Sequence, residues 1–95
     1  RQMEYLACRL LEFLKENYPE LIEKRYGIRT DDIEPADEET IGCVVGFELL
    51  ERIGRKRGFL VSGGEINTER AAITVMDEFR NGTLGRLTLE KPKGY

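Results

Sequence analysis

The chain has 95 residues, of which 40% are apolar and 35% are charged, which is enough for one small folded domain and too little for two. It contains no histidine, and this excludes Ser–His and Cys–His hydrolases and most zinc sites, because these need an imidazole. Residues 1–50 carry a net charge of −6 and residues 51–95 a net charge of +3, so a polyanionic partner would meet the second half. Ordinary solvated charge is the alternative explanation.

Two helices are predicted first. Residues 1–17 form an amphipathic helix, with an apolar stripe at helical spacing: Met3, Leu6, Ala7, Leu10, Phe13 and Leu14. Pro19 then opens a short helix that Gly27 closes, with Lys24 and Arg25 near its C-terminal end. The chain opens without Met or an N-cap residue, so we expect it to be a segment of a longer protein.

An acidic stretch and a third helix follow. Six of the ten residues 30–39 are acidic and Pro35 lies among them, which predicts an exposed connector. Residues 40–53 predict a buried helix with an inward stripe: Ile41, Val44, Val45, Leu49, Leu50 and Ile53. Gly42 and Gly46 within it indicate close packing against a neighbour, while Gly54 and Gly58 are expected to end the helix and frame three cations.

The second half predicts one more helix. Residues 59–61 are either a helical turn or a brief strand, and Gly63 and Gly64 form a turn. Asn67 is positioned to cap a helix over 68–80, with an inward stripe of Ala72, Ile73, Met76 and Phe79. Residues 84–90 predict a short extended segment and residues 93–95 a tail. The expected fold class is therefore all-α, a single domain over 1–95 of about four helices with a short extended C-terminal segment.

The sharpest candidate site is a basic cluster of Arg52, Arg55, Lys56 and Arg57. Four cations within six residues can neutralise several phosphates. The alternative is helix C-capping, which explains one or two of the four. No GxxxxGK[ST] or GxGxxG motif is present, so the Gly63–Gly64 pair indicates a tight turn rather than a nucleotide site.

Other features point to a cytoplasmic protein without metal, catalytic or membrane sites. Cys8 and Cys43 form no CxxC pair and are expected to be reduced thiols rather than a disulfide. No apolar run approaches the ~18 residues of a membrane span. The acidic residues 30–39 lack the spacing of an EF-hand loop, and no nucleophile and base pair stands out.

The strings PELIEKRYG, GRKRGFLVSGGEIN and DEFRNGTLGRLTLEKP occur in this order, and together they resemble the C-terminal domain of the ribosome biogenesis GTPase A family, the circularly permuted YlqF-type GTPases. The resemblance covers about residues 5–92. It implies an all-α domain that docks a GTPase on large-subunit ribosomal RNA during assembly. This chain has no P-loop, NKxD or DxxG motif, so the resemblance places GTP and magnesium in a GTPase domain absent from this chain.

Two hypotheses follow from these observations. In the first, the domain binds ribosomal RNA of the large subunit or its precursor particle through backbone phosphates, using Arg52, Arg55, Lys56, Arg57, Arg70, Arg80 and Arg86 on a frame whose loop glycines are Gly54, Gly58, Gly63 and Gly64. In the second, Gly42, Gly46 and residues 59–61 form a surface that packs on the protein's own GTPase domain or a ribosomal protein. In neither is this chain itself an enzyme or a holder of a cofactor.

Overall fold

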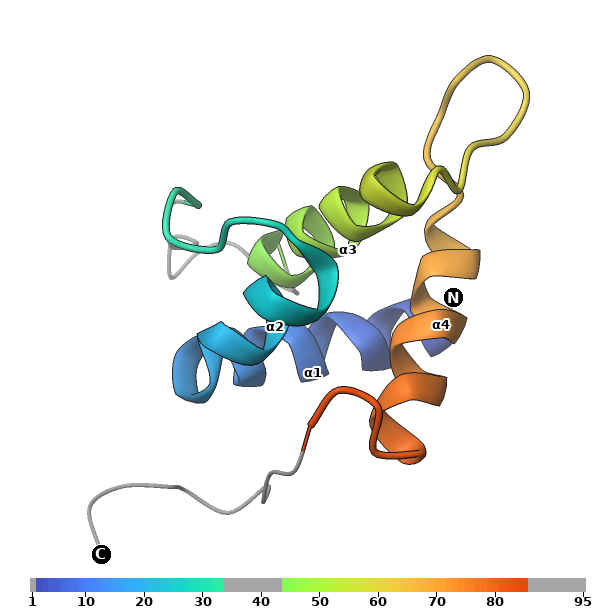
Figure 1. The fold of residues 1–95 in the computed structure, drawn as a ribbon. Coiled ribbons are helices and arrows are strands. Elements are labelled where there is room, and N and C mark those ends of the chain that lie inside the picture. Colours follow the sequence, from blue (N-terminus) through green and yellow to red (C-terminus); the bar gives the residue numbers. More distant parts are fainter. Residues whose placement is uncertain (1, 34–43, 86–95) are drawn as a thin grey trace, which may run out of the picture.

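The computed structural model of the chain describes residues 2–33 and 44–85, and these residues form four helices (Figure 1). Helix α1 spans Gln2–Asn17, α2 spans Pro19–Tyr26, α3 spans Val44–Arg57 and α4 spans Thr68–Arg80. Within the described ranges the β-structure is limited to one isolated bridge. The predicted all-α class is confirmed. The predicted extended segment beyond Gly85, the tail and connector residues 34–39 lie outside the described residues.

The core is built around α1, which packs against each of the other three helices. In Figure 1, α2 and α3 lie along one side of α1 while α4 crosses it near its N-terminal end. All four helices contribute fully buried side chains: Ala7, Leu11 and Leu14 from α1, Ile22 from α2, Leu49, Leu50 and Ile53 from α3, and Ala71, Ala72 and Val75 from α4. One continuous apolar cluster therefore holds the domain together.

Three side chains predicted to face inward are exposed. Leu6 is 51% exposed, Val44 50% and Ile73 45%. On α1, apolar residues occur on more than one face, and the face toward α3 and α4 carries Cys8 and Leu11 instead. On α4 the buried residues are small, which lets this helix approach its neighbours closely.

At Gly46, α3 packs closely against α1. A Cβ atom at this position would overlap the backbone carbonyl of Cys8. The Gly46 amide also lies 3.2 Å from the Glu12 carboxylate, to which it donates a hydrogen bond. The close packing predicted at Gly46 is therefore confirmed, while Gly42 and Ile41 lie outside the described residues.

Gly54 does not end a helix, contrary to the prediction. It is buried inside α3, and a Cβ there would lie 2.6 Å from the Cγ2 atom of Ile66. Its role is to admit the Ile66 side chain, since a helix tolerates glycine where a neighbour needs the space. The helix ends instead at Gly58, whose φ is +75°.

The segment between α3 and α4 projects from the helical body (Figure 1). Leu60 and Ile66 form an antiparallel bridge, so residues 59–61 are extended and not a helical turn. Gly63 and Gly64 have φ values of +89° and +81°, as the predicted turn requires. The Asn67 side chain accepts a hydrogen bond of 3.1 Å from the Arg70 amide and caps α4, as predicted.

Candidate nucleic-acid interface

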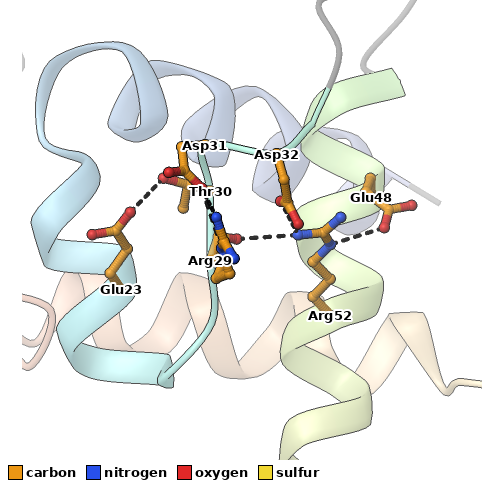
Figure 2. A network of polar contacts seen from close by, with 7 residues as sticks. All are labelled: Glu23, Arg29, Thr30, Asp31, Asp32, Glu48 and Arg52. Atoms are coloured by element: carbon orange, nitrogen blue, oxygen red, sulfur yellow. Dashed lines mark hydrogen bonds and ion pairs between the residues drawn. The ribbon is translucent and has the colours of Figure 1, made fainter.

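Arg52 is held in an intramolecular network on the outer side of α3 (Figure 2). Its Nε donates to Glu48 at 2.9 Å and its Nη1 to Asp32 at 2.6 Å and to the Arg29 carbonyl at 3.3 Å. Only 24% of its side chain is exposed. The guanidinium therefore fixes the segment that follows α2 onto α3, and these contacts occupy the side chain that the sequence suggested for phosphate.

The surroundings of Arg52 are acidic. Figure 2 shows the carboxylates of Asp31, Asp32 and Glu48 paired with the guanidiniums of Arg29 and Arg52, and Glu23 bound to Thr30 in the same network. The hydrogen bond from Arg52 lowers the pKa of the Asp32 carboxyl, so this group stays charged. A polyanion would meet net repulsion here.

The first residues of the predicted connector are part of this network and not merely a spacer. Thr30 is buried, and its hydroxyl donates a 2.8 Å hydrogen bond to the Glu23 carboxylate. Arg29 and Asp31 pair at 3.1 Å on the surface. The acidic residues at this end thus orient the chain as it leaves α2.

Arg57, the last residue of α3, belongs to a second network, five residues beyond Arg52. Its Nη2 lies 3.5 Å from the Oε2 atom of Glu78, and its guanidinium carbon lies 5.2 Å from the ring centroid of Tyr26. Arg25 binds the same carboxylate with two hydrogen bonds, of 3.1 Å from Nε and 2.8 Å from Nη2. The Tyr26 hydroxyl donates a third, of 2.8 Å. Glu78 therefore joins α2, α3 and α4.

These contacts shift the pKa values of Glu78 and Tyr26 in opposite directions. The hydrogen bonds from Arg25 lower the pKa of Glu78 although its partial burial opposes this. Burial, together with the hydrogen bond to Glu78, raises the pKa of Tyr26 well above its ordinary value. Both groups therefore keep their usual protonation state at neutral pH, with Glu78 charged and Tyr26 neutral.

Arg55 and Lys56 are the exposed members of the basic cluster. Within residues 2–33 and 44–85 neither side chain forms an ion pair or a hydrogen bond. Arg55 lines a shallow surface hollow with Phe47, Glu51 and Glu65, whereas Lys56 lies on the other side of the helix end, toward Gly27. The cluster of four cations predicted from the sequence is thus divided into two exposed and two intramolecularly bound side chains.

The remaining predicted contacts do not gather at one place. Arg70 stacks over the Phe59 ring at 4.3 Å, at the start of α4. Arg80, at the other end of that helix, pairs with Asp77 at 3.0 Å. Arg86 lies outside the described residues. The structure therefore does not assemble the predicted arginines into one continuous surface among the residues it describes.

Two cations that the sequence assigned only to helix capping lie next to the basic cluster. Lys24 and Arg25 line a surface hollow of about 390 Å³ together with Thr83 and Gly85, and Arg25 shares Glu78 with Arg57. The signal available in the sequence was the Lys–Arg pair before Gly27. The Lys24–Arg25 pair lies near Arg57 only because α2 packs against the rest of the domain as it does. The spacing of residues along the chain does not reveal this packing.

The described part of the chain also bears on metal sites and on membrane-spanning helices. It holds no group of three or more acidic, cysteine or histidine side chains placed to bind a metal ion. None of its helices combines the length and the apolar character that crossing a bilayer requires. The basic end of α3 remains the strongest candidate.

No protein-family model matches the chain. Curated relatives do. The chain is 40% identical over 83 residues to the ribosome biogenesis GTPase A of Bacillus licheniformis, an alignment that covers 87% of this chain and 25% of that protein. The corresponding protein of Bacillus pumilus is 41% identical over 83 residues, which is 87% of this chain and 26% of the relative.

A more distant relative is an uncharacterised GTP-binding protein of Methanocaldococcus jannaschii, 30% identical over 87 residues, with 92% of this chain and 20% of that protein aligned. The chain therefore spans about a quarter of the length of the curated relatives it matches. The resemblance predicted from the sequence is confirmed, and the chain is homologous to a C-terminal portion of the ribosome biogenesis GTPase A proteins.

Proposed function

We propose that this domain docks a GTPase onto the ribosomal RNA of the large subunit, or its precursor particle, during ribosome assembly in the cytoplasm. The observation that carries the proposal is the pair of exposed cations at the end of α3. Arg55 and Lys56 have no ion pair with another described residue, so both charges are available to phosphate oxygens. The names of the relatives supply the biological setting, ribosome biogenesis and GTP binding.

The mode of recognition follows from the chemistry of this surface. Arginine and lysine side chains on a rigid helix end contact backbone phosphates, which position a protein on RNA without reading its sequence. The helical body provides the frame, because Arg57 and Arg52 fix α3 to α2 and to the segment after it. We therefore expect recognition by shape and charge.

GTP binding belongs, in this proposal, to another part of the parent protein. The sequence has none of the loops that hold phosphate, magnesium and guanine in GTPases. Calorimetry with GTP and magnesium should detect no binding to this chain at micromolar concentrations. Heat of binding in that range would contradict this assignment.

RNA binding is tested by measuring the affinity of the chain for large-subunit ribosomal RNA at several salt concentrations. The variant R55A/K56A should bind more weakly, and its slope of log affinity against log salt should be shallower by about 0.9 for each lost phosphate contact on a duplex. Arg57 is left intact because it binds Glu78 and Tyr26. The control R9A/K15A removes two cations from α1 and should bind nearly as the parent does. Equal affinities and slopes for all three proteins would contradict the proposal.

A second candidate function is docking on the protein's own GTPase domain or on a ribosomal protein. The observation that favours it is the exposure of Leu60 (54%) and Val61 (43%) on the projecting segment. Gly46, predicted to share this surface, is buried against α1 and is not available to a partner. An apolar contact would change little with salt, so the same salt series separates the two functions.

A further inference from the structure

The C-terminal ends of α2 and α3 meet in the folded domain. Lys56 of α3 lies against Gly27, the residue that closes α2, with its Cε atom 3.3 Å from where a Cβ of residue 27 would be. Lys24 lies one turn before Gly27 on α2. Two cations that are 32 positions apart in the sequence are thereby brought to the same end of the molecule.

At the same two helix ends, Arg25 and Arg57 share one carboxylate, that of Glu78. Arg25 binds Glu78 at 2.8 Å and Arg57 approaches the same Oε2 atom at 3.5 Å. Their side chains are 37% and 29% exposed, whereas that of Glu78 is 13% exposed. Each guanidinium has five N–H donors, and the contacts to Glu78 use one or two of them, so the others remain for a further acceptor. Because Glu78 already holds both side chains in place, little conformational freedom is left to lose on binding.

The surroundings of Arg52 and of Arg57, five residues apart on α3, differ in charge. Arg52 and Arg29 pair with the carboxylates of Asp32, Glu48 and Asp31, and Glu23 lies in the same network (Figure 2). Arg57 and Arg25 share the carboxylate of Glu78, and Lys56 lies nearby against Gly27. A polyanion would therefore be repelled from the surroundings of Arg52 and attracted to those of Arg57.

Helix capping does not account for these cations. Gly27 closes α2 with its own amide, which donates a 2.9 Å hydrogen bond to the Glu23 carbonyl. Arg25 and Arg57 direct their donors to Glu78 instead of to helix-terminal carbonyls. In the described ranges Lys24 and Lys56 form no ion pair or hydrogen bond at all. The two lysine side chains therefore have no partner among the described residues and are available to an external anion.

We propose that α2 supplies half of a phosphate-binding surface, in which Lys24 and Arg25 act together with Lys56 and Arg57 on consecutive phosphate groups of an RNA backbone. This inference rests on the proposed function for the source of the phosphates. It extends the interface from the end of α3 to the end of α2 and excludes Arg52 and its acidic surroundings from it.

The test uses the variant K24A/K56A, because both lysines are exposed and their removal breaks no side-chain ion pair or hydrogen bond within the described structure. Its binding to large-subunit ribosomal RNA is measured across a salt series and compared with that of the parent chain and of R9A/K15A. The R9A/K15A control has the same net charge as K24A/K56A. Inorganic tripolyphosphate is titrated separately into the isotopically labelled parent chain, and amide signals are followed by NMR.

Several-fold weaker RNA binding and a shallower salt slope for K24A/K56A, but not for R9A/K15A, would support the surface. Tripolyphosphate should shift the amides of residues 24–27 and 55–58 together. If the parent binds RNA and the two double variants are indistinguishable, the α2 surface is wrong and the proposed function stands. If the parent binds no RNA, the proposed function fails, and the tripolyphosphate titration alone then tests the phosphate-binding surface. Absent shifts, or shifts spread equally over α1, would overturn that surface.

Discussion

The backbone carbonyl of Cys8 occupies the space that a Cβ atom of residue 46 would need. Glycine at this position therefore sets the distance between α1 and α3, and backbone atoms on both helices make the contact. A side chain can turn aside from a new methyl group, but a helix backbone can do so only if the whole helix moves. The contact is consequently a fixed point of the fold.

Gly46→Ala should lower the free energy of unfolding by about 1–3 kcal/mol, in spite of the better helix propensity of alanine. Gly54→Ala is the matched comparison, since its new Cβ would meet side chains and not backbone, namely the Cγ2 methyl of Ile66 and, in ordinary contact, the Cβ of Ala71. The free energy of unfolding of Gly54→Ala should fall by less than that of Gly46→Ala, or stay nearly unchanged. Urea unfolding of both variants measures the difference, and equal losses would show that backbone contact is not what makes Gly46 special.

Glu78→Gln should destabilise the domain by about 1–3 kcal/mol at pH 7, because a partly buried carboxylate that serves Arg25, Tyr26 and Arg57 loses its charge. The folded state lowers the pKa of Glu78, so its contribution is present above the ordinary value of 4.5 and is lost as pH falls below it. The difference between parent and variant should therefore shrink from pH 7 to pH 3 in urea unfolding. The exposed Glu16→Gln is the control, and a difference that does not depend on pH would contradict the assignment.

Tyr26→Phe removes the hydroxyl that donates to Glu78 and should cost about 0.5–1.5 kcal/mol. The pKa of Tyr26 is raised in the folded state, so its contribution to stability changes with pH in the opposite direction to that of Glu78. Its contribution is complete below the ordinary value of 10.0 and is lost as the pH rises above it, because the unfolded chain then ionises first. Thermal melting between pH 8 and pH 11 should show a smaller alkaline decline in the variant. A parallel decline would mean that Tyr26 does not cause it.

Asn67→Ala should cost about 1 kcal/mol, since the Arg70 amide loses the side-chain oxygen that caps α4. Asn67→Asp keeps an acceptor at the same place and should restore most of the loss. Helicity and melting temperature measured by circular dichroism check both variants. Equal destabilisation by Ala and Asp would argue against capping.

Arg52→Ala should release the segment after α2 from α3 with little effect on RNA binding. Arg52→Lys should hold this segment on α3 only in part, because an ammonium group cannot donate to Asp32 and Glu48 with the fixed geometry of a guanidinium. Amide hydrogen exchange at residues 29–33 should become faster in both variants. Arg80→Ala, which breaks a pair within α4, serves as the control. Unchanged exchange in Arg52→Ala would mean that the network does not hold this segment.

The sequence predicted the helices and the turn well, because apolar spacing, Asn67 and the glycines act locally. It placed Leu6 and Ile73 in the core wrongly, since apolar residues on several faces leave the rotation of a helix to its neighbours. It treated Gly54 as a helix end because a glycine that ends a helix and one that admits Ile66 look alike in a sequence. For the site, it identified the charges but not their partners. Glu78 and Asp32 reach Arg57 and Arg52 only through the tertiary fold.

The central position of α1 has a consequence for how the chain folds. Its contacts with α3 and α4 join residues far apart in the sequence, whereas α3 and α4 are close neighbours along the chain. Closing those long loops costs chain entropy before the core contacts can form and stabilise the fold. This cost slows folding relative to bundles whose helices pack in sequential pairs. We therefore expect refolding slower than that of a sequential bundle of equal length, with the docking of α1 onto the α3–α4 pair as the step that limits the rate.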